Sequence, residues 1–78
     1  MRVTVHLHAN LRKYAPPGST GAVQVDLPEG AAVHDAVSHL GIPERHAGVV
    51  FLGQERAEFA AKLVDGAEVN LFPPLGGG

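Results

Sequence analysis

One stretch of this 78-residue chain has the pattern of an amphipathic helix, and it is long enough to cover only one side of a core. Asp35 lies in its first turn, where a negative charge favours the helix dipole. Gly41 suits a left-handed helix end, whereas Ala31 and Ala32 offer no capping oxygen, so we expect a weak start. The apolar stripe, at i, i+3, i+4 and i+7, consists of Val33, Ala36, Val37 and Leu40.

The segments around this helix have the patterns of strands. Apolar and polar residues alternate from residue 2 to residue 9, which predicts a half-buried strand whose inner face ends at Ala9. The run Val49–Leu52 is apolar throughout, so we expect that strand to be buried on both faces. The complete set of expected strands is 2–9, 23–27, 49–52, 55–58 (a short edge strand) and 69–72.

One helix cannot cover both faces of a sheet, and this fixes the expected fold class. We expect a single α+β domain, a roll in which a mixed sheet of four to five strands has one main helix packed across one face. Leu11 and Tyr14 predict one helical turn that closes the open end of the core. Most of the remaining large apolar residues should be buried in that core: Phe51, Phe59, Leu71 and Phe72.

Composition excludes several classes of function. The chain has no cysteine, which excludes a disulfide framework, a thiolate metal site and a thiol nucleophile, and which fits a cytoplasmic protein. Its formal net charge is −2 and its six basic residues do not cluster beyond Arg12-Lys13, so we expect no nucleic-acid partner. The amino-terminal strand pattern leaves no room for a signal-peptide core, and we expect no membrane span.

The histidines invite a metal-site hypothesis, which we set aside. His6 and His8 are two apart on a strand and so lie on the same face, but no third ligand accompanies them. We expect a solvated strand face and no metal site. Asp35 and His39 are four apart on the helix, where they could form a surface pair, and His46 should lie in a loop.

The carboxyl-terminal residues combine stiffness with an absence of side chains. We divide the chain into a folded domain, 1–72, and a tail, 73–78, in which Pro73 and Pro74 stiffen the start. Six extended residues reach about 20 Å, which is enough to enter a partner's active site. Phe72 and Leu75 are candidates for docking at the base of the tail.

The reactive group we expect is the carboxylate of Gly78. It is ionised at neutral pH and resists nucleophilic attack until it is activated, for example as an acyl-adenylate. An enzyme that activates it must close around the terminus and exclude water, and the side-chain-free Gly76 and Gly77 allow that approach. The alternative is an inert tail, either a disordered end or a cloning remnant.

The ending Phe72-Pro73-Pro74-Leu75-Gly76-Gly77-Gly78 resembles that of the MoaD/ThiS family of ubiquitin-like sulfur carriers, above all the molybdopterin synthase small subunit. Weaker matches lie along the whole chain. Ala32, Ala67 and Leu52-Gly53 depart from the family pattern, none of them at the reacting end. The weaker matches are Leu11-Arg12, Leu27-Pro28-Glu29-Gly30 and Leu63-Val64-Asp65-Gly66.

The resemblance implies a β-grasp fold and a carrier that is not an enzyme alone. A ubiquitin-activating-type adenylyltransferase (MoeB/ThiF-like) would use ATP to adenylate Gly78, with no cofactor bound to the carrier itself. A sulfur donor such as a cysteine desulfurase or rhodanese would give a thiocarboxylate. The sulfur would pass to a molybdopterin or tungstopterin precursor on a molybdopterin synthase large subunit-like partner.

Other functions remain open on the sequence. The same chemistry serves a ubiquitin-like protein modifier, and it serves sulfur carriers for thiamin, cysteine or tRNA thiolation. Two further alternatives are a plain β-grasp interaction module with an inert tail and a histidine metal-binding domain.

Overall fold

The computed structural model describes residues 1–74, and its elements follow the expected order with one addition. The helical turn expected after the first strand is a 3-10 helix, η1, and a short helix that was not expected, α2, precedes the third strand. The elements are β1 (Arg2–Leu7), η1 (Ala9–Tyr14), β2 (Ala22–Asp26), α1 (Val33–His39), α2 (Glu44–Ala47), β3 (Val49–Leu52), β4 (Glu55–Ala57) and β5 (Glu68–Phe72).

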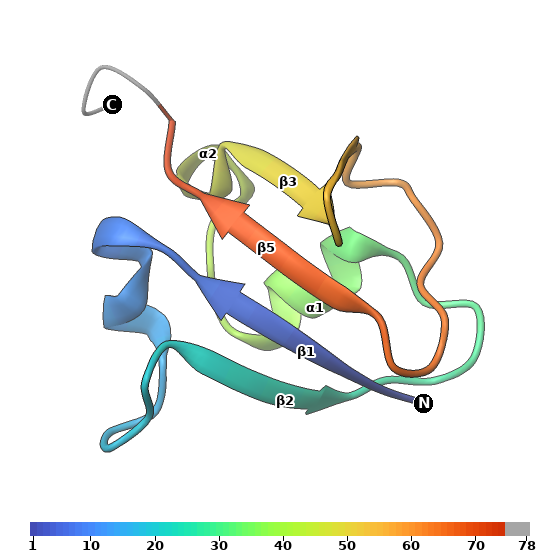
Figure 1. Ribbon diagram of the computed structural model, residues 1–78, viewed down its shortest axis with the longest axis horizontal. Helices are drawn as coiled ribbons and strands as arrows, with labels where there is room; N and C mark the ends of the chain where they lie inside the picture. The colour runs from blue at the N-terminus through green and yellow to red at the C-terminus, as the bar shows by residue number, and fades with distance from the viewer. Residues whose placement is uncertain (75–78) are drawn as a thin grey trace.

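The five strands form one mixed sheet in the order β2-β1-β5-β3-β4 (Figure 1). The first and last strands, β1 and β5, lie side by side and parallel, while every other pair is antiparallel. Val5 pairs with Val69 and Leu7 with Leu71, so the central strands place their apolar residues at the same level. The expected mixed sheet and α+β fold are confirmed.

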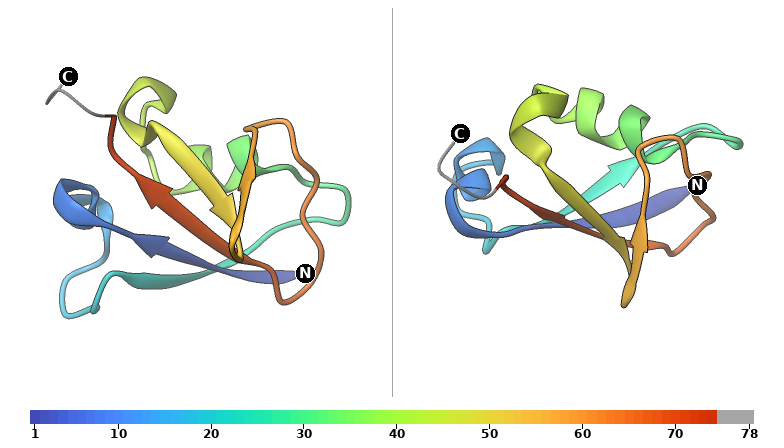
Figure 2. Two further views of the ribbon diagram at one scale, coloured as in Figure 1. Left: turned by 45° about the horizontal axis from the view of Figure 1, so that its top comes forward. Right: turned by 90° about the horizontal axis from the view of Figure 1, so that it is seen from above.

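Helix α1 lies across one face of the sheet and encloses the core (Figure 2). Its inward residues Val33, Ala36 and Val37 are buried, as the stripe predicts. Leu11 from η1 is buried at the end of the core and Tyr14 packs partly against it, which confirms the predicted helical turn. No polar side chain among residues 1–74 is buried, so the core is held by apolar packing alone.

The start of α1 is capped in a way that its own sequence does not reveal. The carbonyl oxygens of Ala61 and Phe59 accept hydrogen bonds from the amides of Val33 (3.0 Å) and His34 (2.9 Å). The Asp35 carboxylate also accepts one from the amide of Ala32 at 2.7 Å. These partners satisfy amides that a helix otherwise leaves unpaired, so the expected weak start is compensated by a distant loop.

The predicted end of α1 is confirmed, whereas the predicted end of the first strand is wrong. Gly41 adopts φ +74° and the amide of Ile42 donates to the carbonyl of Val37 at 3.1 Å, which is the predicted left-handed helix end. The first strand, by contrast, stops at Leu7. Ala9 is exposed with φ +53° and starts η1, so its assignment to the buried face was wrong.

Two expectations about burial are also wrong. Val50 is buried in β3, but Phe51 is only half-buried because it lies on the sheet face away from α1. We expected most of Phe51, Phe59, Leu71 and Phe72 to lie in the core, but of these only Leu71 is buried and Phe59 is half-buried. Phe72 is exposed, which agrees with its candidacy for docking. The sheet has one covered face, and residues that alternate onto its other face have no layer above them.

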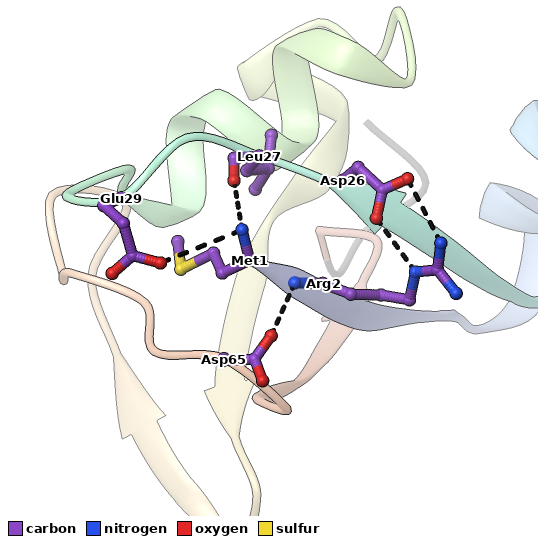
Figure 3. A network of polar contacts seen from close by, with 6 residues as sticks. All are labelled: Met1, Arg2, Asp26, Leu27, Glu29 and Asp65. Carbon is purple, nitrogen blue, oxygen red and sulfur yellow. Dashed lines mark hydrogen bonds and ion pairs between the residues drawn. The ribbon is translucent and has the colours of Figure 1, made fainter.

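A polar network ties the chain start to its neighbours at the end of the molecule opposite the tail (Figures 1 and 3). The Met1 amino group donates to the Leu27 carbonyl at 2.8 Å, and the Arg2 amide donates to Asp65 at 2.8 Å. The Arg2 guanidinium pairs with Asp26 at 2.9 Å. That hydrogen bond and the positive charge of Arg2 lower the pKa of Asp26. The same hydrogen bond and the negative charge of Asp26 raise the pKa of Arg2.

Candidate functional site

The chain leaves the sheet from its central strand. Strand β5 lies between β1 and β3 and ends at Phe72, and the chain continues as Pro73 and Pro74. We call these three residues the tail exit. It lies at the same end of the molecule as η1 and α2 (Figures 1 and 2). The tail exit therefore starts from a strand that is hydrogen-bonded to a neighbour on each side.

A glycine lies directly against the backbone of the tail exit. Gly48 joins α2 to β3 with φ +63° and forms an isolated bridge with Phe72. A Cβ atom added at Gly48 would lie 2.5 Å from the Pro74 nitrogen, 2.6 Å from the Phe72 oxygen and 2.7 Å from the Pro73 carbonyl carbon. All three distances are shorter than real Cβ contacts allow, so only glycine fits this position without a shift.

The Phe72 side chain is held on the sheet face away from α1. Its ring stacks on that of His8, with centroids 4.2 Å apart and planes within 7°. Phe51 meets it edge-on at 5.8 Å. Phe72 nevertheless remains 36% exposed, one of two large apolar residues so exposed among residues 1–74. A ring that is oriented and yet accessible is suited to contact a partner.

A small cavity lies between the tail exit and the two short helices. Pro73 and Pro74 line it together with Tyr14 from η1 and His46 from α2, whose hydroxyl and Nδ1 are 3.1 Å apart. Its volume is about 80 Å³, well below the roughly 300–1,000 Å³ of small-molecule sites. We conclude that the cavity is too small for a nucleotide and that its lining residues bring the tail exit close to η1 and α2.

The histidines have individual partners. His6 contacts the Glu68 carboxylate, and His8 donates to the Asn70 side-chain oxygen at 3.1 Å. Within residues 1–74 no group of three or more metal-ligating side chains is gathered. The suggested Asp35–His39 pair is wrong, because the Asp35 carboxylate contacts Ala32 and His34. His46 lies in α2 and not in a loop.

The sequence-predicted site residues divide into two groups. Phe72, Pro73 and Pro74 lie together at the tail exit, with Phe72 exposed as a docking residue requires. Leu75, Gly76, Gly77 and Gly78 lie outside the described residues, so their predicted roles stay predictions. Sequence reasoning missed Gly48, because the glycine precedes the apolar strand and its partners at the tail exit are distant in the sequence.

No helix in the described part of the chain has the length and hydropathy needed to cross a membrane. The contacts that distinguish this domain lie at the tail exit.

Comparison with solved structures finds the same fold in archaeal proteins. The crystal structure of SAMP1 from Haloferax volcanii has a TM-score of 0.75 at 29% identity, covering all of both chains. A structure of H. volcanii small archaeal modifier protein 1 gives 0.76 at 27%, covering 95% of this chain and 98% of that one. A candidate molybdopterin converting factor, subunit 1, from Pyrococcus furiosus gives 0.73 at 25%, covering 96% and 99%.

A search of curated protein sequences finds no significant match. The ThiS family, however, matches residues 5–78, which is nearly the whole chain and includes the tail exit. With the β-grasp fold, this match makes the chain a small carrier, modifier or subunit and not a catalyst by itself. The chain therefore belongs to the ThiS family, among the ubiquitin-like β-grasp sulfur carriers and modifiers.

Proposed function

We propose that this protein is a cytoplasmic sulfur carrier whose Gly78 carboxylate accepts sulfur for molybdopterin or tungstopterin biosynthesis. The observation that carries the proposal is the tail exit. A doubly paired central strand passes directly into Pro73-Pro74, held against Gly48, and the sequence then continues to Gly76-Gly77-Gly78. This arrangement fixes the point at which the segment that carries the terminal carboxylate begins.

The chemistry follows from the carboxylate. Its oxygen attacks the α-phosphorus of ATP held by an adenylyltransferase, and pyrophosphate leaves. The terminal sulfur of a persulfide on a desulfurase or rhodanese then attacks the carbonyl carbon and displaces AMP, which gives an acyl disulfide. A second thiol attacks the donor's sulfur in that S–S bond, so the thiocarboxylate leaves and a disulfide forms between the two thiols. The proposed acceptor is a pterin precursor on a larger partner subunit, in keeping with the Pyrococcus neighbour's name.

A second candidate function has its own support. Two of the structural neighbours are forms of an archaeal protein named as a modifier. The activation step is identical for a modifier, and the products differ: a modifier ends in an amide bond to a target lysine, whereas a carrier returns to its free form after it gives up sulfur.

Intact-mass spectrometry of the protein isolated from its native cells separates the two. We expect a species heavier by about 16 Da, because sulfur replaces one oxygen at the terminus. Conjugates that survive reducing agent, with no such species, would establish the modifier instead. Incubation of the sulfur-loaded form with a pterin precursor, a thiamin precursor or tRNA then identifies the acceptor.

Phe72 provides a test of docking. We expect Phe72→Ala to lower kcat/KM for adenylation about tenfold, because an exposed, oriented ring is a typical anchor for a partner. Pyrophosphate exchange with the adenylyltransferase measures this. Val64→Ala is the matched control, since Val64 is also an exposed apolar residue (69%) but precedes β5 at the far end of the domain. Equal rates for the two variants would remove Phe72 from the docking surface.

A further inference from the structure

We propose that Gly48 is a positioning residue for the reactive terminus: it sets the direction in which the chain leaves β5. The inference rests on the proposed function, because direction matters only if the terminus reacts inside a partner. It concerns a residue that no motif marks, directly after α2, a helix that the sequence did not predict.

The contact at Gly48 is made by backbone alone. The atoms that a Cβ would meet at 2.5–2.7 Å belong to three successive residues, Phe72, Pro73 and Pro74. A flexible side chain could turn away from a new methyl group, but these main-chain atoms cannot. Phe72 is also fixed by pairing with Val49 across β3. A substitution at Gly48 must therefore displace Pro73 and Pro74 before it displaces the strand.

Gly48 differs from Gly53, a glycine with a nearly equal φ angle. Gly53, in the turn between β3 and β4, has φ +60°, and a Cβ there would meet nothing within 4 Å. Both glycines resist substitution because of their positive φ, and Gly48, at ψ −97°, also lies outside the left-handed α region. Gly48 alone of the two adds a collision with the tail exit, so the spin-label map described below is needed to separate a change in direction from backbone strain.

A small change of direction at the tail exit has a large effect at the terminus. The four residues after Pro74 can reach at most about 13 Å, and a change of about 15° in the exit direction shifts the point that a fully extended tail would reach by about 3 Å. Reacting groups must lie within tenths of an ångström of their productive positions, and a misplacement of about 1 Å can cost 100-fold in rate. We therefore expect the effect of a Gly48 substitution in kcat more than in KM.

Gly48→Ala is compared with Gly53→Ala in adenylation by the partner enzyme, at a temperature where circular dichroism shows both to be folded. We expect kcat to fall about 10- to 100-fold for Gly48→Ala, with KM changed less than about threefold because Phe72 stays paired with Val49 and keeps its ring stacked on His8. Gly53→Ala should stay within about twofold of wild type. Equal kcat for the two variants, or a Gly48→Ala chain that does not fold, would overturn the inference.

Further substitutions test whether the stiffness of Pro73 and Pro74 transmits the change in exit direction. If a rigid exit transmits the error, combining Gly48→Ala with Pro73→Ala and Pro74→Ala should recover at least about threefold in kcat, because a softer exit can bend back. No recovery would mean that Gly48 acts through the body of the domain.

A readout without activity separates this inference from the proposed function. Because the chain has no cysteine, Gly77→Cys accepts a single nitroxide label, whose relaxation effect on the amides of η1 and α2 can be mapped. We expect Gly48→Ala to redistribute that effect and Gly53→Ala to leave it unchanged. An unchanged map for Gly48→Ala refutes the inference, whereas a changed map with an unreactive wild-type chain refutes the proposed function alone.

Discussion

We expect removal of Gly77 and Gly78 to abolish sulfur loading and to leave the domain as stable as before. The shortened tail still ends in a carboxylate, but that group lies about 7 Å short of its normal reach. Adenylation requires the carboxylate against the α-phosphate, so we expect kcat/KM to fall at least about 1,000-fold. Pyrophosphate exchange and the loss of the heavier species in intact-mass spectra measure the effect.

The matched control keeps the length of the tail and adds a side chain. Gly78→Ala retains the carboxylate at its normal position with one methyl group beside it, so we expect a loss of about tenfold, between wild type and the truncated chain. The melting temperature should stay the same in all three, because the changes lie beyond β5. A truncated chain that still takes up sulfur would show that the reaction does not use this terminus.

Replacement of Leu71 by alanine has the largest expected effect on stability. Leu71 is fully buried in β5, opposite Leu7 on one side and Val50 on the other. Truncation of a buried leucine costs about 2–5 kcal/mol, and a domain of this size has on the order of 5 kcal/mol in total. We expect the thermal midpoint to fall by more than about 10 °C, with part of the population unfolded at 37 °C.

The neighbouring residue supplies the control. Phe72 follows Leu71 on the same strand but faces away from the core, so Phe72→Ala should lower the midpoint by much less although it removes more atoms. Denaturant titrations followed by circular dichroism compare the two. Similar losses of stability would mean that the open face of the sheet contributes as much to folding as the core does.

The fold could be predicted from the sequence where the signal is local. The helical stripe around Val37 and the stop at Gly41 depend only on residues within two turns, and both are found in the structure. The missed elements depend on distant contacts. The cap of α1 comes from Phe59 and Ala61, and α2 has four residues, too few to show a periodic stripe.

The errors in burial have a different origin. An apolar residue in a strand reports that it avoids water, but not which layer it meets. Phe51 and Phe72 cover each other on the face without a helix, which no pattern within either strand could indicate. The same limit applies to Gly48, whose partners in the tail exit are more than twenty positions further along the chain.

Because β1 pairs in parallel with β5, the sheet can form completely only in a chain that includes its last strand. The centre of the sheet is assembled from the first and last strands of the domain, so a chain cut before β5 loses the middle strand of the sheet and two buried core residues, Val69 and Leu71. Such a chain cannot stay folded, and unfolded chains are removed by proteases. A partner that docks only the folded domain therefore meets chains complete through the strand that leads into the tail.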